Sequence, residues 1–137
     1  MKVLVDTSIW SVAFRRKALS ENESAILNEL RRLVADLQVV MIGPIRQELL
    51  SGISDPAKYE RLKEALTAFP DESIETADYE LAAKFSNDCR RNGVQGSHID
   101  FLICSVAFKN VWKIFTSDQD FLRYQQYLPL ELYSIGE

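Results

Sequence analysis

The sequence has one histidine and two cysteines, and this scarcity excludes several kinds of site. A metal-free ribonuclease that uses two histidines as acid and base cannot be built with His98 alone. Cys89 and Cys104 lie in segments with helical patterns, so a structural disulfide is not expected. Two thiols and one imidazole also do not make a zinc site. We interpret both cysteines as packing residues or surface thiols.

The sequence also lacks an excess of basic residues and a long hydrophobic run. Its net charge is −4, so a broadly basic surface is not how it would hold nucleic acid. Local basic patches and a metal ion would have to hold any polyanion. No apolar run approaches the roughly 20 residues of a membrane span. Met1-Lys2 leads directly into a strand pattern that Asp6 interrupts, unlike a signal peptide. We therefore expect a cytoplasmic protein without membrane contact.

The pattern of apolar residues predicts one domain over residues 1–137. Strands are expected over five short segments: residues 2–5, 39–42, 73–75, 113–116 and 130–135. Helical patterns lie between them, with starts marked by the capping box from Ser20 to Glu23, by Asp55-Pro56 and by Ser97. This alternation predicts an α/β fold, with a central, mostly parallel sheet of about four to five strands and helices on both faces.

Acidic residues stand where the chain should pass from strand or turn into helix. Asp6 and Asp118 each follow an apolar strand pattern. Asp100 falls in the first turn of a helix that is otherwise apolar around it, and Glu48 falls in the helix after the second strand. In open α/β sheets, ligands bind at the edge where the strands have their carboxyl ends. These four residues are therefore candidates for one site.

Each candidate also has a purely structural interpretation. Asp6 and Asp118 could cap the helices that follow them, because helix starts favour Asp. Glu48 could be a solvated helical residue, and Asp100 could form a variant capping box with Ser97. Capping does not exclude a site, since the same helix starts lie at the edge of the sheet.

Carboxylates gathered at one edge repel one another unless a cation joins them. Oxygen ligands without a cluster of histidines or cysteines select Mg²⁺ or Mn²⁺ over Zn²⁺. A hard cation beside a polyanion suggests phosphodiester chemistry. The sequence therefore favours a magnesium or manganese site.

Four segments form an ordered set across nearly the whole chain. They are Val5-Asp6-Thr7-Ser8, Pro44-Ile-Arg-Gln-Glu48-Leu, Asn92-Gly93 with Ile99-Asp100-Phe-Leu-Ile-Cys-Ser-Val-Ala107, and Phe115-Thr-Ser-Asp118-Gln-Asp120-Phe121. The set resembles the PIN-domain ribonucleases, and within them the VapC toxins of bacterial type II toxin–antitoxin pairs. The chain length is similar too.

The resemblance implies an acidic quartet of catalytic residues: Asp6, Glu48, Asp100 and Asp118. Asp6 and Asp100 would be the most direct metal ligands, and Asp118 would act directly or through water. Glu48 would complete the pocket through a water molecule or through hydrogen bonds that face the substrate. Ser8 and Thr116 fit supporting roles around the ligands. Asp120 is a weaker candidate for a ligand.

The implied activity is hydrolysis of RNA phosphodiester bonds by a water that Mg²⁺ or Mn²⁺ activates. A toxin of this kind would inhibit translation by cutting a tRNA or ribosomal RNA. The resemblance also implies a homodimer and a cognate antitoxin. We expect the antitoxin to bind beside the first two helices and the helix over residues 55–69. The basic turn Arg15-Arg16-Lys17 either contacts RNA phosphates or is simply solvated.

Other functions fit the same residues. One is a PIN-like nuclease for RNA processing or for structured DNA, although the small size favours the toxin. Another is a catalytically silent PIN-like interaction domain, against which the intact quartet argues. A phosphatase with an aspartyl nucleophile is less favoured, because Asp6-Thr-Ser lacks a second acid two residues on.

Overall fold

The computed structural model describes residues 1–15 and 17–136. Within these ranges, four short strands form one sheet in the order β3-β2-β1-β4, and all neighbouring strands are parallel. The strands are β1 (Val3–Val5), β2 (Val39–Ile42), β3 (Asp71–Glu72) and β4 (Lys113–Phe115). Val3 lies opposite both Val39 and Lys113. The predicted parallel α/β sheet is confirmed.

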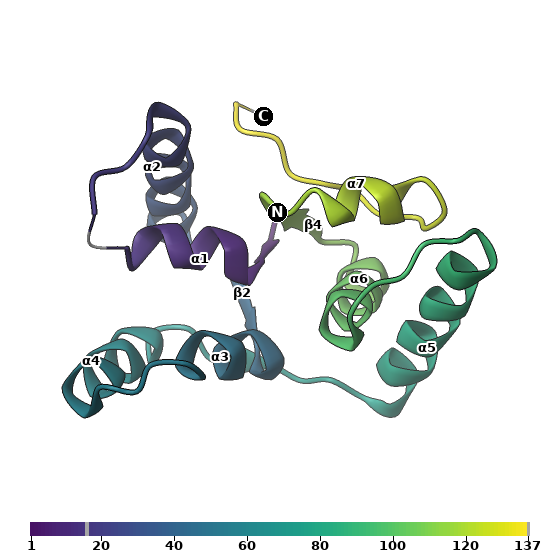
Figure 1. The fold of residues 1–137 in the computed structure, drawn as a ribbon, viewed down its shortest axis with the longest axis horizontal. Helices are drawn as coiled ribbons and strands as arrows, with labels where there is room; N and C mark the ends of the chain where they lie inside the picture. Colours follow the sequence, from purple (N-terminus) through teal and green to yellow (C-terminus); the bar gives the residue numbers. More distant parts are fainter. Residues whose placement is uncertain (16, 137) are drawn as a thin grey trace.

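Seven helices in the described ranges connect and cover the strands. They are α1 (Thr7–Ala13), α2 (Glu21–Ala35), α3 (Gly43–Leu50), α4 (Pro56–Leu66), α5 (Thr76–Arg91), α6 (His98–Asn110) and α7 (Asp120–Gln125). Figure 1 shows α1 and α2 on one side of the strands and α5 and α6 on the other. The predicted caps at Ser20, Asp55 and Ser97 are confirmed. None of these helices combines the length and the apolarity that a bilayer crossing demands.

Two of the predicted strands are wrong. Residues 73–75 are not a strand, because the pairing with β2 falls earlier, at Asp71–Glu72. The segment 130–135 is reduced to a single parallel bridge between Leu132 and Ile114. Its buried apolar residues therefore reflect packing against the core and not a continuous ladder.

Helix α6 lies between the strands and α5 (Figure 1). Seven consecutive residues, Phe101–Ala107, are buried, so the helix has no solvated face along this stretch. Its Cys104 and the Cys89 side chain of α5 are both fully buried, which confirms packing roles for these residues. Burial also raises the pKa of the Cys104 thiol. Because α6 is enclosed, its first turn holds Asp100 in a fixed place relative to the sheet.

The strands β1, β2 and β4 end side by side, because parallel strands have their carboxyl ends at one edge of the sheet. Val5 at the end of β1 lies opposite Phe115 at the end of β4. The amide of Asp6 donates to the Phe115 carbonyl at 2.9 Å, which ties the two chain segments together just beyond the strands. The sheet therefore places the residues after β1 and β4 in contact.

Candidate metal centre

Asp6 is a nearly buried carboxylate with 6% of its surface exposed. Three donors converge on its Oδ2: the Thr116 hydroxyl at 2.8 Å, the Ser8 hydroxyl at 2.8 Å and the Ser8 amide at 3.4 Å. The last bond makes Asp6 the N-cap of α1. Oδ1 has no hydrogen bond from the described part of the chain. Asp6 thus caps a helix and still leaves one oxygen for another partner.

The Thr116 hydroxyl connects this carboxylate to the turn after β4. It donates to Asp6 and accepts the Asp118 amide at 3.0 Å. One oxygen of Asp118 in turn accepts the Asp120 amide at 2.9 Å, and the Ser117 amide donates to Ser8 at 3.0 Å. Ser8 and Thr116 therefore lie beside the carboxylates, where the sequence predicts supporting residues. Their contribution to activity stays a prediction.

Asp100, Asp118 and Asp120 form the tightest acidic group in the described residues. Each offers one carboxylate oxygen, and the three oxygens lie within 4.8 Å of one another. Asp100 comes from the first turn of α6, whereas Asp118 and Asp120 come from the turn and helix after β4. Asp120, the weaker candidate of the sequence, stands here with the two stronger ones. Arg123, one turn along α7, contacts Asp120 at 2.5 Å.

Asp6 and Glu48 do not belong to this group of three. Asp6 is near enough for its charge to raise the pKa of the Asp100 carboxyl. Glu48 is an exposed residue of α3, and within residues 1–15 and 17–136 it has no hydrogen bond or ion pair to the other acids. The structure thus brings Asp100, Asp118 and Asp120 together and places Asp6 near them, whereas Glu48 shares no hydrogen bond or ion pair with them in the described residues.

The Asp100 carboxyl has the clearest electrostatic signature of the site. Burial raises its pKa most, and the negative charges of Asp6 and Asp118 raise it further. Hydrogen bonds from Tyr124 and Ser97 lower it in part. A bound cation would favour the ionised form and relieve the repulsion. Because the donors are carboxylate oxygens without imidazole or thiolate, they suit Mg²⁺ or Mn²⁺.

The sequence analysis missed Tyr124, whose hydroxyl donates to Asp100 Oδ2 at 2.7 Å. The residue is fully buried, and its ring lies 5.1 Å from the ring of Phe101 and 5.3 Å from that of Phe121. Burial and the Asp100 carboxylate both raise the pKa of Tyr124, so its hydroxyl remains a donor. In the sequence, Tyr124 is indistinguishable from the apolar core residues of a short helix, so no local pattern marks it as a site residue.

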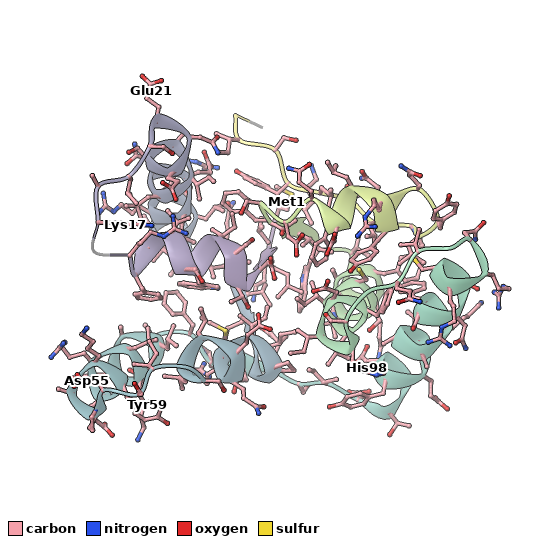
Figure 2. The ribbon with its side chains drawn as sticks, viewed as in Figure 1. Met1, Lys17, Glu21, Asp55, Tyr59 and His98 are labelled. Carbon is pink, nitrogen blue, oxygen red and sulfur yellow. The ribbon has the colours of Figure 1, made fainter. Side chains whose placement is uncertain are left out.

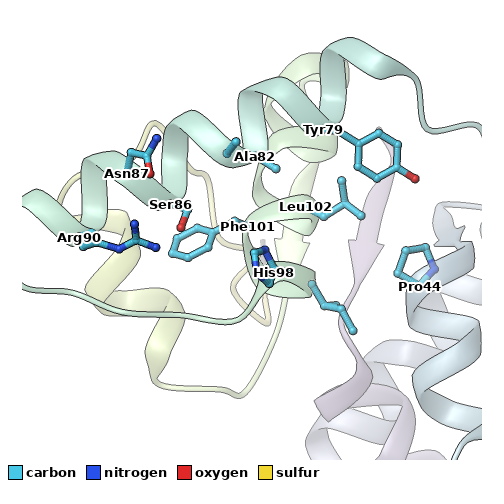
Figure 3. A pocket seen from close by; sticks show the side chains of 11 residues that line it. Pro44, Tyr79, Ala82, Ser86, Asn87, Arg90, His98, Phe101 and Leu102 are labelled. Atoms are coloured by element: carbon cyan, nitrogen blue, oxygen red, sulfur yellow. The ribbon is translucent and has the colours of Figure 1, made fainter.

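A groove of about 360 Å³ lies between α5 and α6; we call it the α5–α6 groove. Figure 3 shows side chains of α5, such as Tyr79 and Ser86, facing Phe101 and Leu102 of α6. The full lining is Pro44, Tyr79, Ala82, Ala83, Ser86, Asn87, Arg90, His98, Ile99, Phe101 and Leu102. The lining includes Ile99 and Phe101, the neighbours of Asp100 in the chain, but none of the three acidic residues.

The basic turn after α1 gives little support to the predicted phosphate contacts. Arg15 forms an ion pair with Glu23 of α2. Lys17 is exposed, and Figure 2 shows it on the opposite side of the molecule from His98, which begins α6. Arg16 lies outside the described residues. A role of this turn in RNA binding stays a prediction.

Comparison with known proteins identifies relatives of the chain. The PIN domain model matches residues 3–126. The VapC ribonuclease Mb1587 of Mycobacterium bovis and ribonuclease VapC11 of Mycobacterium tuberculosis are each 31% identical over 123 residues, which cover 87% of this chain and 88% of theirs.

Two solved structures have the same fold. FitAcB from Neisseria gonorrhoeae gives a TM-score of 0.76 at 16% identity and covers 96% of both chains. VapBC2 from Rickettsia felis, bound to a DNA fragment from its promoter, gives a TM-score of 0.74 at 19% identity and covers 97% of this chain and 98% of that one.

Proposed function

This chain belongs to the PIN-domain family, among the relatives of the VapC ribonucleases, and we propose that it is a metal-dependent endoribonuclease. The observation that carries this proposal is the group of Asp100, Asp118 and Asp120 oxygens within 4.8 Å of one another. The group lies at the edge of a parallel sheet where ligands bind in α/β folds. Its oxygen-only chemistry suits Mg²⁺, with Mn²⁺ as a substitute.

The catalytic residues of the proposal are those expected from the sequence: Asp6, Glu48, Asp100 and Asp118. Asp6, Asp100 and Asp118 would hold the ion, with Asp120 as a further candidate. When bound, the ion would lower the pKa of an attacking water and screen the charge of the phosphate. Thr116 and Ser8 donate to Asp6 Oδ2, so Oδ1 would be the oxygen available to the ion. Glu48 would face the substrate from α3, directly or through water.

The experiment that tests the proposal is cleavage of RNA by the purified protein before and after chelation. EDTA should stop cleavage, and Mg²⁺ or Mn²⁺ should restore it. Zn²⁺ should not do so comparably, because the acidic group in the described residues offers carboxylate oxygens alone. Cleavage that persists after rigorous chelation, with no metal found by mass spectrometry, would contradict a metal-dependent mechanism.

The biological setting we propose is that of a toxin that inhibits translation by cutting a tRNA or ribosomal RNA in the cytoplasm. The likeness to the VapC ribonucleases supports this setting. An RNA-processing nuclease remains the alternative within enzymes, and a silent interaction domain remains the alternative outside them. A neighbouring reading frame whose product suppresses cleavage would favour the toxin over both.

The partner of such a toxin would be an antitoxin, for which we propose a seat between α1 and α4. A cavity of about 190 Å³ lies there, lined by Phe14, Ile53, Lys58, Arg61, Leu62 and Ala65. Phe14 is 40% exposed and gives this cavity an aromatic wall. A helix or extended tail with apolar side chains fits this surface. Ala65→Glu should then relieve inhibition by the partner without reducing cleavage.

A second copy of the chain is the partner that we propose for the α5–α6 groove. Ala82, Ala83 and Ser86 are small residues on one face of α5, so another helix can approach closely there. Tyr79 beside them is 55% exposed and supplies a large apolar side chain for an interface.

A further inference from the structure

We propose that Tyr124 is a positioning residue that orients the Asp100 carboxylate toward the metal ion; this inference rests on the proposed metal-dependent nuclease. The Tyr124 hydroxyl donates to Asp100 Oδ2 at 2.7 Å. A carboxylate held by a donor on one oxygen has a fixed plane and presents its other oxygen in a defined direction. The same arrangement occurs at Asp6, where Thr116 and Ser8 hold Oδ2.

The Tyr124 ring is held firmly enough to perform this task. The residue is fully buried, and its ring contacts Phe101 of α6 and Phe121 of α7 at centroid distances of 5.1 and 5.3 Å. Phe101 is the residue after Asp100, so the same turn of α6 supplies both the aromatic neighbour and the hydrogen-bond acceptor. The hydroxyl therefore has a position set by packing on two helices.

Gly96 provides the space that the hydroxyl occupies. A Cβ atom built on Gly96 would lie 2.7 Å from Tyr124 Cζ and closer still to the hydroxyl oxygen, well inside van der Waals contact. The backbone of Gly96 is not in the left-handed region, so only this close approach requires glycine there. The loop before α6 thus fits directly against the phenol, and a larger residue would displace it from Asp100.

Helix α7 links Tyr124 to a second residue of the acidic group, Asp120. Asp120 begins α7, and Tyr124 follows one helical turn later. The helix therefore carries one carboxylate of the acidic group and also the donor that fixes another. Asp100, Asp118 and Asp120 repel one another in the absence of a cation, and the bond from Tyr124 opposes rotation of Asp100 away from the group.

A matched control exists in Tyr133, a second buried tyrosine whose hydroxyl donates to a carboxylate, that of Glu29, at 2.8 Å. Arg32 donates to the same hydroxyl at 2.7 Å. Neither Glu29 nor Arg32 belongs to the acidic group. Removing this hydroxyl costs two part-buried hydrogen bonds, at least as large a loss as at Tyr124, but leaves the candidate centre intact.

The test measures Mn²⁺ binding by calorimetry and thermal unfolding for the full chain with Tyr124→Phe or Tyr133→Phe. Loss of a residue that orients a metal ligand typically weakens metal binding about 10-fold or more. We expect this loss for Tyr124→Phe, and wild-type affinity for Tyr133→Phe, although both variants should melt at lower temperature. The turnover number of Tyr124→Phe should fall, while its KM for RNA stays near the wild-type value.

Gly96→Ala is the second variant, because its methyl group meets both the hydroxyl and the ring carbon Cζ and so displaces the phenol without changing Tyr124 itself. It should weaken Mn²⁺ binding in the wild-type background and add little in the Tyr124→Phe background. If Tyr124→Phe and Gly96→Ala are folded and bind Mn²⁺ as the wild type does, while Asp100→Asn does not, the positioning role is wrong and the proposed function stands. If the wild type itself binds no Mn²⁺, the proposed function and the positioning role both fall.

Discussion

The Thr116 hydroxyl donates a 2.8 Å hydrogen bond to Asp6 Oδ2, across the ends of the neighbouring strands β1 and β4. The same hydroxyl accepts the amide of Asp118. One side chain thus joins the carboxylate that follows β1 to the acidic turn that follows β4. The Ser8 amide, which makes Asp6 the cap of α1, donates to the same Oδ2. Capping therefore leaves Oδ1 of Asp6 without a hydrogen bond from the described residues, so a capping role does not prevent Asp6 from holding another partner.

Replacement of Thr116 tests this connection. Thr116→Val removes the donor to Asp6 and the acceptor for Asp118 but keeps the side-chain shape, so the loss should cost about 1–3 kcal/mol of stability for the unsatisfied groups. RNA cleavage should fall as the carboxylates lose their common anchor. Thr116→Ser keeps the hydroxyl and should retain most of both properties. Urea unfolding and a cleavage assay measure the two effects; equal activity of the Val and Ser variants would argue against the anchor.

Asp100→Asn should abolish RNA cleavage and weaken Mn²⁺ binding without unfolding the protein. Burial and the charges of Asp6 and Asp118 raise the pKa of the Asp100 carboxyl, so removing its charge relieves repulsion in the metal-free state. The melting temperature without metal should therefore stay constant or rise. Asp36→Asn is the control, because Asp36 is an exposed acid paired with Arg32. Full cleavage by purified Asp100→Asn would refute the assignment of the site.

The sequence predicts the edge of the sheet much better than it predicts the contacts made there. Asp6 and Asp118 follow short apolar runs, and the alternation of strands with helices requires those runs to be parallel, so their ends meet. Tyr124 lies 24 residues beyond Asp100, and their contact depends on how α7 packs against α6. No local pattern encodes that packing. The same holds for Asp120, whose place in the acidic group depends on the turn after β4.

The errors in strand prediction have a similar origin. Ile74 is a partly buried residue packed against the core, so the segment around it has the apolar pattern of a strand. The ladder with β2, however, ends at Glu72. Leu130 and Tyr133 are buried near the chain end with only one bridge at Leu132. Apolar alternation reports burial on one side, and burial does not require a continuous ladder.

The ion pair of Glu29 and Arg32 predicts a pH dependence of stability outside the candidate centre. Burial raises the pKa of Glu29, but hydrogen bonds from Tyr133 and Arg32 outweigh it and lower the pKa overall. An acid with a lowered folded pKa adds stability above its unfolded pKa, and loses it as the pH falls through the folded pKa. Glu29→Gln should therefore destabilise the protein at pH 7, and the deficit should shrink below the ordinary pKa of Glu, about 4.3. Urea unfolding over this range measures it; a deficit independent of pH would contradict the prediction.

Ala83→Arg should convert the proposed dimer to a monomer. Ala83 is an exposed, small residue of the α5–α6 groove, and a long charged side chain there would block the approach of a second helix. Lys84→Ala, at the next position of the helix and outside the groove lining, should leave the dimer unchanged. Light scattering at micromolar concentration, in buffer with Mg²⁺, distinguishes the outcomes. A wild-type protein that is monomeric under these conditions would contradict the dimer.

Selective cleavage of a structured RNA is the last expectation, and it follows from charge. The net charge of −4 opposes broad adhesion to RNA, and Arg15 of the basic turn is already paired with Glu23. Binding should therefore depend on few phosphates and on the shape of the RNA, with a shallow dependence of affinity on salt. Sequencing of RNA ends after a short induction in cells should reveal one or a few cut sites, in a tRNA or ribosomal RNA. The Asp100→Asn variant should produce none of these ends. Uniform degradation of all RNA would refute selectivity, because it would show that the shape of the RNA does not decide which phosphodiester bonds reach the carboxylates.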